Sequence, residues 1–238
     1  GENYLKSIIS QDRVYSSINS YSKKRCEIFF KSILNKSSKL YFVKSPTDCE
    51  FSKIVENSYR AVNIALTDEW LKFAKYLGVD LLKINNLISY RRTHSNIMKP
   101  GIGVGGYCLP KDPYFFKISN KFIFKNKSFK FPLISQAVKI NKKMYLNSFN
   151  QVLSNLPKKK TILFAGIAYK ENVDDIRNSP SLKLAKKLSH TYKVDLYDPL
   201  IEKKILNLIS IKKINNIKKK YDAVILGVKH QQFLKKNF

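Results

Sequence analysis

Three short apolar runs near the end of the chain constrain its fold more than any other feature. Residues 159–166 (KKTILFAG), 194–199 (VDLYDP) and 221–228 (YDAVILGV) each carry an apolar core and end in a turn. Such runs are typical of strands that are buried on both faces of a parallel sheet. A helix should begin at Ser179-Pro180, between the first two runs, because proline suits the first helical turn. This alternation predicts an α/β domain with a doubly wound parallel sheet, which binds ligands at the carboxyl ends of its strands.

The middle of the chain has helical periodicity instead. Apolar residues at helical spacing predict one long helix over residues 47–76, which Gly78 ends. Further helices are predicted at residues 81–90 and about 131–156. The long helix is apolar over more than one stripe, so we expect it to be buried on two sides, one of them against a partner subunit.

The opening residues predict a small strand–helix–strand segment. Its strands are expected at residues 12–15 and 39–43, with a helix over 20–34 whose apolar face carries Phe29, Phe30 and Ile33. A segment of this size is too small for a self-sufficient sheet domain, so it is interpreted as the end of a larger one. The expected domains are the remnant at 1–46, a central all-helical domain at 47–157, and an α/β domain, expected to be incomplete, at 158–238.

Residues 101–112 (GIGVGGYCLPKD) carry the densest set of chemically active groups. The four glycines within six positions let the backbone approach a ligand closely. Cys108 follows at once, with Lys111 and Asp112 one turn later, and a helix start at this point would favour the thiolate. The alternative is a glycine loop beside a buried, inert cysteine. Because no predicted strand precedes the loop, it is not read as a Rossmann phosphate fingerprint.

Composition disfavours several classes of protein. Of the 45 basic residues, 39 are lysine and 6 are arginine, and the lysines are scattered. Nucleic-acid binding is therefore a less favoured explanation of the net charge of +28, since proteins recognise bases mainly through the bidentate guanidinium of arginine. Three cysteines without a CxxC motif predict neither a disulfide framework nor a metal site. No apolar run approaches the roughly 20 residues that span a bilayer, and the first residues lack signal-peptide character, so we expect a cytoplasmic chain.

Three blocks of sequence resemble one enzyme family. Residues 101–112 are similar to GxGxGGxCxxKD, the active-site signature of the UDP-glucose/GDP-mannose dehydrogenase family. Residues 53–65 (KIVENSYRAVNIA) resemble the family's central helix, and residues 166–180 (GIAYKENVDDIRNSP) resemble its GLAFKxxxDDxRxSP block. The blocks share the family's order and spacing, and the resemblance covers nearly the whole chain. Details around the cysteine look closer to the UDP-N-acetylhexosamine members than to the UDP-glucose enzymes.

The resemblance implies NAD-dependent oxidation of C6 of a nucleotide sugar, from alcohol to acid, for surface-polysaccharide precursors. The Cys108 thiolate would attack the intermediate aldehyde to give a thiohemiacetal, then a thioester that water hydrolyses. Lys53 and Asn57, four residues apart on one helix face, would stabilise the oxyanion and position water. Asp112 would handle protons together with this lysine. Without the cysteine loop, Lys53 and Asn57 would be interpreted as a pair of surface residues, and Asp112 as an aspartate at the start of a helix.

The resemblance also implies the residues that bind ligands. Lys111 and Arg177 match positions on the NAD side, although Arg177 could equally belong to a helix-capping turn with a surface ion pair. Arg92 would reach the sugar of the neighbouring subunit in a homodimer formed through the central helix, or be a plain surface residue beside Arg91. The full set matched to substrate binding is Gly101, Gly103, Gly105, Gly106, Lys99, Tyr169, Lys170 and Arg92.

One feature of the family is missing from the chain. No strand, GxGxxG turn and helix precede Asp12, so we expect no turnover by this chain alone and a separate N-terminal NAD-binding chain or segment as its partner. The alternatives are a non-catalytic remnant that dimerises and binds a UDP-sugar, and a basic nucleic-acid-binding protein. The sequence leaves open which nucleotide and which sugar are bound.

Overall fold

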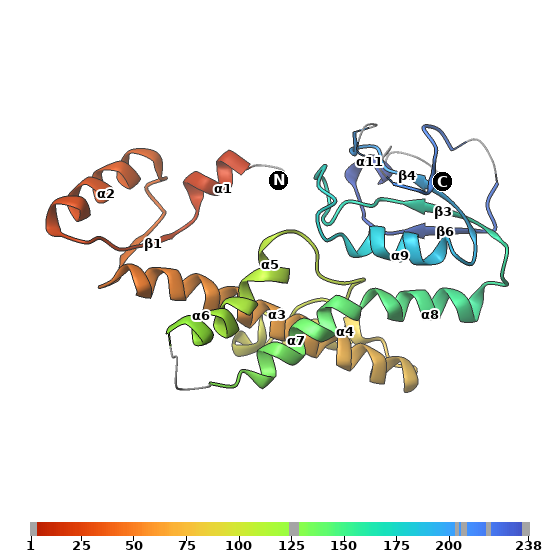
Figure 1. Cartoon of the computed structure of the whole chain (residues 1–238), viewed down its shortest axis with the longest axis horizontal. Coiled ribbons are helices and arrows are strands. Elements are labelled where there is room, and N and C mark those ends of the chain that lie inside the picture. Colours follow the sequence, from red (N-terminus) through yellow and green to blue (C-terminus); the bar gives the residue numbers. More distant parts are fainter. Residues whose placement is uncertain (1–3, 124–128, 203–204, 206–208, 218–219, 235–238) are drawn as a thin grey trace. The chain divides into compact units, whose positions relative to one another are not determined.

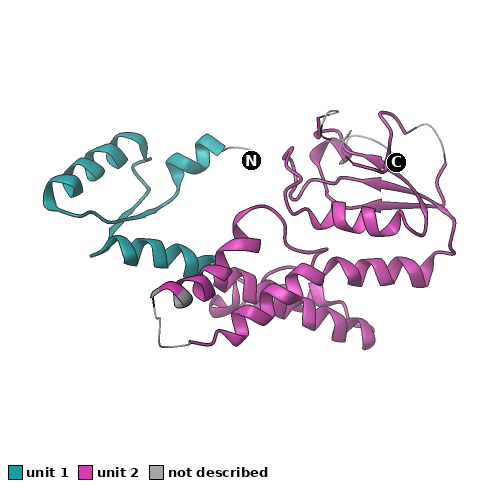
Figure 2. Cartoon of the chain, in the orientation of Figure 1, with its two compact units in different colours: residues 1–57 teal, residues 58–238 magenta. Residues whose placement is uncertain are grey.

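The computed structural model describes residues 4–123, 129–202, 205, 209–217 and 220–234. The chain forms two compact units, residues 1–57 and 58–238, and their boundary falls within the long helix α3 (Pro46–Tyr76) (Figure 2). None of the helices in the described ranges combines the length and the apolar character needed to cross a bilayer.

The first unit contains the predicted strand–helix–strand arrangement. Its elements are α1 (Tyr4–Ser10), β1 (Arg13–Tyr15), α2 (Ser20–Ile33), β2 (Leu40–Phe42) and the first turns of α3. β1 and β2 pair in parallel, in a register that runs from Arg13 opposite Leu40 to Tyr15 opposite Phe42. The predicted apolar face of α2 is only partly packed, because Phe30 contacts the ring of Tyr15 whereas Phe29 is 59% exposed.

The long helix is confirmed over the predicted range. It ends in the turn at Gly78, which has a φ of +68°, and the backbone N–H of Val79 donates to the carbonyl of Ala74 at 2.8 Å. Its small residues Ala61 and Ala65 are buried. Large apolar residues on other faces of the helix remain exposed in the single chain.

The rest of the helical region follows in the second unit. Its elements are α4 (Leu81–Ser89), η1 (Arg92–His94), α5 (Cys108–Lys111), η2 (Asp112–Tyr114), α6 (Phe115–Ile123), α7 (Pro132–Lys143) and α8 (Tyr145–Asn155) (Figure 1). The single helix predicted over residues 131–156 was wrong in one respect, because Met144 divides it into α7 and α8. There the N–H of Asn147 donates to the carbonyl of Met144, a tighter turn than an α-helix makes.

The last part of the chain is the predicted doubly wound parallel sheet. Its elements are β3 (Thr161–Ala165), α9 (Pro180–Leu188), β4 (Lys193–Tyr197), β5 (Lys212–Lys213), β6 (Ala223–Leu226) and α11 (Gln231–Leu234). The strand order is β5-β4-β3-β6, and every neighbouring pair is parallel. Ser179 caps α9 as its side chain accepts a hydrogen bond from the N–H of Leu182. The short strand β5 was not predicted.

The sheet is buried on both faces, as its apolar runs require. Ile162 and Phe164 of β3 face a core that includes Leu184 of α9, and α8 and α9 pack side by side against it (Figure 1). Leu163 of β3 faces the opposite core, together with Phe233 of α11. Side chains of α8 pack against the larger of these two cores, so this helix joins the helical region to the sheet within the second unit.

Candidate active site

The glycine-rich loop before α5 is hydrogen-bonded to the segment that follows β3. The N–H of Gly106 donates to the carbonyl of Arg177 at 2.8 Å, and the side-chain amide of Asn178 donates to the carbonyl of Gly106 at 2.9 Å. Asn178 adopts a left-handed backbone conformation with a φ of 52°. Two of the three sequence blocks that indicated the function are therefore in direct contact.

Steric contact explains why the loop needs a glycine at position 105. A Cβ atom there would lie 2.7 Å from the Cβ of Tyr169 and 3.0 Å from the Cδ of Pro180. A glycine was expected to allow close approach of a ligand, but the close neighbour at this position is the chain's own Tyr169. By contrast, nothing lies within 4 Å of a Cβ built at Gly101.

Cys108 is the first residue of α5 and is exposed to solvent. The alternative of a buried, inert cysteine does not describe this thiol. Asp112 lies one turn further on, at the start of η2, and is 8% exposed. The ammonium of Lys111 approaches its carboxylate to 3.3 Å. The turn thus presents a thiol and a carboxylate–ammonium pair next to the glycine loop.

The two residues predicted to bind NAD meet at one aromatic ring. The Lys111 ammonium lies 4.5 Å from the ring centroid of Tyr107, and the Arg177 guanidinium lies 5.6 Å from it. The guanidinium also donates to Asp175, at 2.6 Å between Nη2 and Oδ2, and this bond holds the pKa of the Asp175 carboxyl below its usual range. Two cations distant in the sequence are thus gathered next to Cys108.

A pocket of about 490 Å³ opens at the carboxyl ends of β3 and β6. This is the edge at which doubly wound sheets bind ligands. Four of the residues predicted to bind substrate line it, namely Gly101, Gly103, Tyr169 and Lys170. The remaining lining residues are Ile102, Glu171, Pro180, Ser181, Leu226, Gly227, Val228 and Lys229.

Sequence reasoning missed the contribution of β6 to this pocket. Lys229 follows the strand predicted at residues 221–228, so its position after a parallel strand was the signal that could have identified it. Ser181, at the start of α9, was also missed; its hydroxyl donates to the carbonyl of Gly227 at 2.9 Å.

The other predicted residues lie outside this pocket. Lys53 and Asn57 belong to the first compact unit, where Lys53 forms an exposed ion pair with Glu56 at 2.9 Å and Asn57 is 1% exposed. Their approach to Cys108 stays a prediction. Arg92 in η1 and Lys99 before the glycine loop are exposed, and neither lines the pocket.

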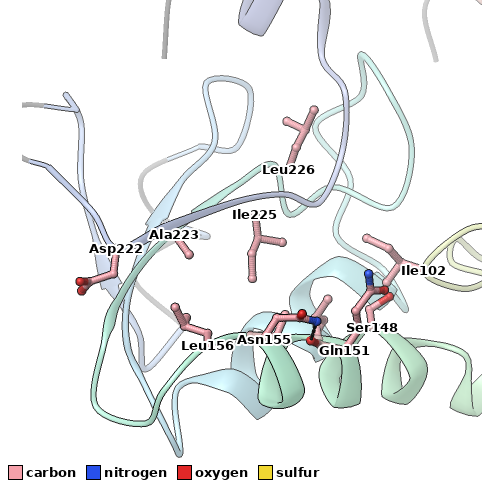
Figure 3. Close-up of a pocket in the computed structure, with 11 residues that line it drawn as sticks. Ile102, Ser148, Gln151, Asn155, Leu156, Asp222, Ala223, Ile225 and Leu226 are labelled. Carbon is pink, nitrogen blue, oxygen red and sulfur yellow. Dashed lines mark hydrogen bonds between the residues drawn. The ribbon is translucent and has the colours of Figure 1, made fainter.

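A second pocket, of about 640 Å³, lies between α8 and β6 (Figure 3). Ile225 points from β6 toward α8, whose Gln151 and Asn155 line the same space, whereas Asp222 lies at one end (Figure 3). Ile102 is the only residue of the glycine loop that lines it. None of the predicted catalytic or ligand-binding residues does so, and the smaller pocket is therefore the candidate site.

Comparison with known proteins assigns the family. Residues 47–143 match the central domain of the UDP-glucose/GDP-mannose dehydrogenase family, and residues 163–238 match its UDP binding domain. UDP-N-acetyl-D-mannosamine dehydrogenase of Methanococcus vannielii is 36% identical over 204 residues, which cover 82% of this chain and 44% of that protein. The enzyme of the same name from Methanocaldococcus jannaschii is 31% identical over 237 residues, covering 98% of this chain and 51% of that protein.

A solved structure supports the same assignment. The UDP-D-ManNAc dehydrogenase of Pyrococcus horikoshii is 29% identical and superposes with a TM-score of 0.74, covering 99% of this chain and 54% of that one. The chain thus spans about half the length of the relatives it matches. The matched ranges contain the glycine loop with Cys108 and the segment to which this loop is hydrogen-bonded. This chain belongs to the UDP-glucose/GDP-mannose dehydrogenase family.

Proposed function

We propose that this chain provides the central and nucleotide-sugar-binding parts of an NAD-dependent dehydrogenase that oxidises C6 of a UDP-N-acetylhexosamine. The observation that carries the proposal is the contact between the loop bearing exposed Cys108 and the Arg177–Asn178 turn, beside the pocket at the strand ends. In this proposal the domains are residues 1–46, 47–157 and 158–238.

The pocket is suited to the diphosphate of a nucleotide sugar. Lys170 and Lys229 bring two positive charges to its wall, and Glu171 brings one negative charge. Ammonium groups bind phosphate oxygens as point charges. We assign Tyr169 to the base, because an aromatic side chain can stack on a nucleobase. The chain's net charge of +28 would also steer a dianionic ligand toward the protein.

Cys108 is the proposed nucleophile. Its sulfur would bond to C6 of the intermediate aldehyde, and the carbonyl electrons would move to oxygen, forming a thiohemiacetal. Loss of a hydride would then leave a thioester, whose hydrolysis releases the acid and restores the thiol. In the proposal, Lys53 and Asn57 stabilise the developing oxyanion, and Asp112 exchanges protons with the lysine.

The residues near Cys108 fit the phosphate end of NAD, which supplies the hydride acceptor when it is bound. Lys111 and Arg177 are gathered at the Tyr107 ring, each also paired with a carboxylate, and their remaining N–H donors suit the oxygens of a diphosphate. The two-stranded sheet of the first unit carries no GxGxxG turn. In the proposal that turn comes from polypeptide outside these residues, in the same protein or in a partner chain.

An exposed apolar stripe on α3 supports a homodimer. Leu66, Trp70 and Phe73 of α3, and Leu77 directly after its end, recur at helical spacing and are 39%, 39%, 64% and 56% exposed. Contiguous exposed apolar surface of this kind marks protein–protein contacts. A twofold pairing would bury the same stripe on both copies, and we assign Arg92 to the partner's sugar site in that dimer.

Titration of nucleotides tests the binding half of the proposal. We expect UDP and UDP-N-acetylhexosamines to bind in isothermal titration calorimetry, and a DNA duplex at the same concentration of phosphate groups not to compete. Lys170→Ala should weaken UDP binding about tenfold, the equivalent of one charged hydrogen bond. Lys186→Ala removes the same charge from an exposed position on α9 and is the matched control. Equal losses of UDP affinity in the two variants would show that UDP binds by nonspecific electrostatic attraction.

Complementation tests the catalytic half. The NAD-binding domain of a relative would be supplied in trans, with NAD and a panel of UDP-sugars, and formation of NADH measured by absorbance. NADH should form with the wild-type chain and be abolished by Cys108→Ser, while UDP affinity is unchanged. Binding without any NADH formation would favour a non-catalytic chain that only binds nucleotide sugar.

A further inference from the structure

Three turns at the carboxyl ends of the strands meet at a buried pair of ionisable residues. Asp198 follows β4 and is 7% exposed, and His230 follows β6 and is fully buried at 0%. The His230 Nε2 lies 3.4 Å from the Asp198 Oδ2. Neither residue was identified as functional from the sequence, and neither is used in the proposed mechanism. Groups of this kind persist in an interior only when their surroundings compensate for their burial.

Asp198 connects the turns after β3 and β4. One carboxylate oxygen accepts from the N–H groups of Ile167 at 2.7 Å and Ala168 at 3.3 Å. The other accepts from the N–H groups of Leu200 at 3.0 Å and Ile201 at 3.3 Å. Burial opposes ionisation, but the proximity of His230 and the hydrogen bonds from the N–H groups of Ile167 and Leu200 outweigh it and hold the pKa of the Asp198 carboxyl below its usual range.

The hydrogen bonds of His230 define its tautomer. Its Nδ1 accepts from the backbone N–H of Asn172 at 2.9 Å, so that nitrogen carries no proton and Nε2 does. The Nε2–H then faces Asp198, at a distance longer than an ideal hydrogen bond. The Asn172 side chain in turn accepts from the N–H of Gln231 at 2.9 Å. His230 and Asn172 thus tie the turns after β6 and β3 together by reciprocal bonds.

These same turns carry the charged side chains of the pocket. Lys170 and Glu171 immediately precede Asn172, and Lys229 immediately precedes His230. Behind them the two backbones are close-packed: a Cβ at Gly166, which has a φ of +82°, would lie 2.5 Å from the carbonyl oxygen of Val228. The contacts of Asn172 with His230 therefore link the two backbone segments that carry Lys170 and Lys229.

We propose that His230 is a positioning residue that, as its Nε2–H tautomer oriented by Asp198, holds Lys170 and Lys229 at the spacing that a diphosphate requires. His230 acts through Asn172 and does not itself touch the ligand. This inference rests on the proposed function of the pocket as a nucleotide-sugar site. It is tested by one measurement that needs no ligand and by one that does.

The tautomer is measured on the ligand-free chain. Long-range ¹H–¹⁵N correlation spectra of the labelled protein distinguish the two neutral tautomers and the imidazolium, and loss of one signal set in His230→Asn assigns His230. At neutral pH we expect the pure Nε2–H form for His230. The exposed His190 provides the comparison within the same spectrum. An Nδ1–H form, an imidazolium or averaged tautomers at His230 would overturn the inference, whether or not the chain binds UDP.

UDP titration then measures the consequence for the pocket. His230→Gln keeps a donor near Asp198 but loses the acceptor for Asn172, and it should weaken UDP binding about tenfold. His230→Asn keeps an acceptor at the Nδ1 position and should recover most of that affinity. Both variants remove the ring from a packed interior, so both should lower the melting temperature, and only the affinity should separate them. His190→Gln is the matched control.

The outcomes separate this inference from the proposed function. If the wild-type chain binds UDP and the two His230 variants have the same UDP affinity as each other, the positioning role is refuted and the proposed function stands. If the wild-type chain does not bind UDP, the proposed function fails, and so does the proposed effect of His230 on UDP affinity. The measured tautomer still tests the contacts of His230 with Asp198 and Asn172. Should His230→Gln not fold, amide exchange at Asn172 and Gln231 replaces it: slower exchange with UDP supports the inference, and unchanged exchange overturns it.

Discussion

Substitution of Gly105 by alanine is the most direct perturbation of the glycine loop. The added Cβ would lie 2.7 Å from the Cβ of Tyr169, 3.0 Å from the Cδ of Pro180 and 3.3 Å from the carbonyl oxygen of Asn178. Two of these neighbours are a side-chain root and a proline ring, which cannot rotate away. The loop must therefore shift, and overpacking of this kind costs about 1–3 kcal/mol.

The matched control is Gly101→Ala in the same loop. No heavy atom lies within 4 Å of a Cβ at that position, so we expect a change within about 0.5 kcal/mol. Urea unfolding followed by the fluorescence of Trp70, the only tryptophan, reports on the second unit, where both glycines lie. A second readout is the alkylation rate of Cys108, which should change in Gly105→Ala because the shifted loop leads directly into α5.

Equal behaviour of the two alanine variants would refute this reasoning. In that case the loop would not be held against Tyr169 and Pro180, and the contact between the cysteine loop and the Arg177–Asn178 turn would lose its support. A loss of stability in Gly105→Ala alone, with the alkylation rate unchanged, would confine the effect to packing and leave the thiol's surroundings unaffected.

Two further predictions concern the sheet and the proposed dimer. Asp222 accepts hydrogen bonds from the backbone N–H and the hydroxyl of Thr161, which together with Lys160 lower its pKa from 3.8 to about 2. Because the pKa of Asp222 is depressed in the folded state, the stabilisation by its carboxylate is present above pH 3.8 and is lost as the pH falls toward 2. The difference in the free energy of unfolding between wild type and Asp222→Asn, measured with urea, should therefore narrow over that range. A difference that stays constant would contradict the assignment. Phe73→Glu places a charge on the α3 stripe and should convert a dimer to a monomer in light scattering, whereas Phe122→Glu on α6, where the phenylalanine is 70% exposed, should not. Identical masses for both variants would argue against the stripe as the interface.

Local sequence patterns predicted most of the elements. The helix over residues 47–76 shows a helical periodicity and β3 shows a continuous apolar run, and both patterns arise within the element itself. The division at Met144 of the helix predicted over residues 131–156 was not foreseen, because neither glycine nor proline marks it and Met144 is 2% exposed in the packed interior. The short strand β5 was missed for a similar reason: it exists by pairing with β4, in a stretch dominated by lysine, asparagine and isoleucine.

The sequence by itself determined the family and the parallel sheet, because local motifs and apolar runs carry both signals; the chemistry of the loop that carries Cys108 stays a prediction. Only the tertiary structure decided that Lys111 and Arg177 meet at Tyr107, and that His230 joins the two turns bearing the charges of the pocket. These contacts join residues far apart along the chain, and no local pattern encodes such pairs. They depend on how the strands are ordered in the sheet and on which side chains that order buries together.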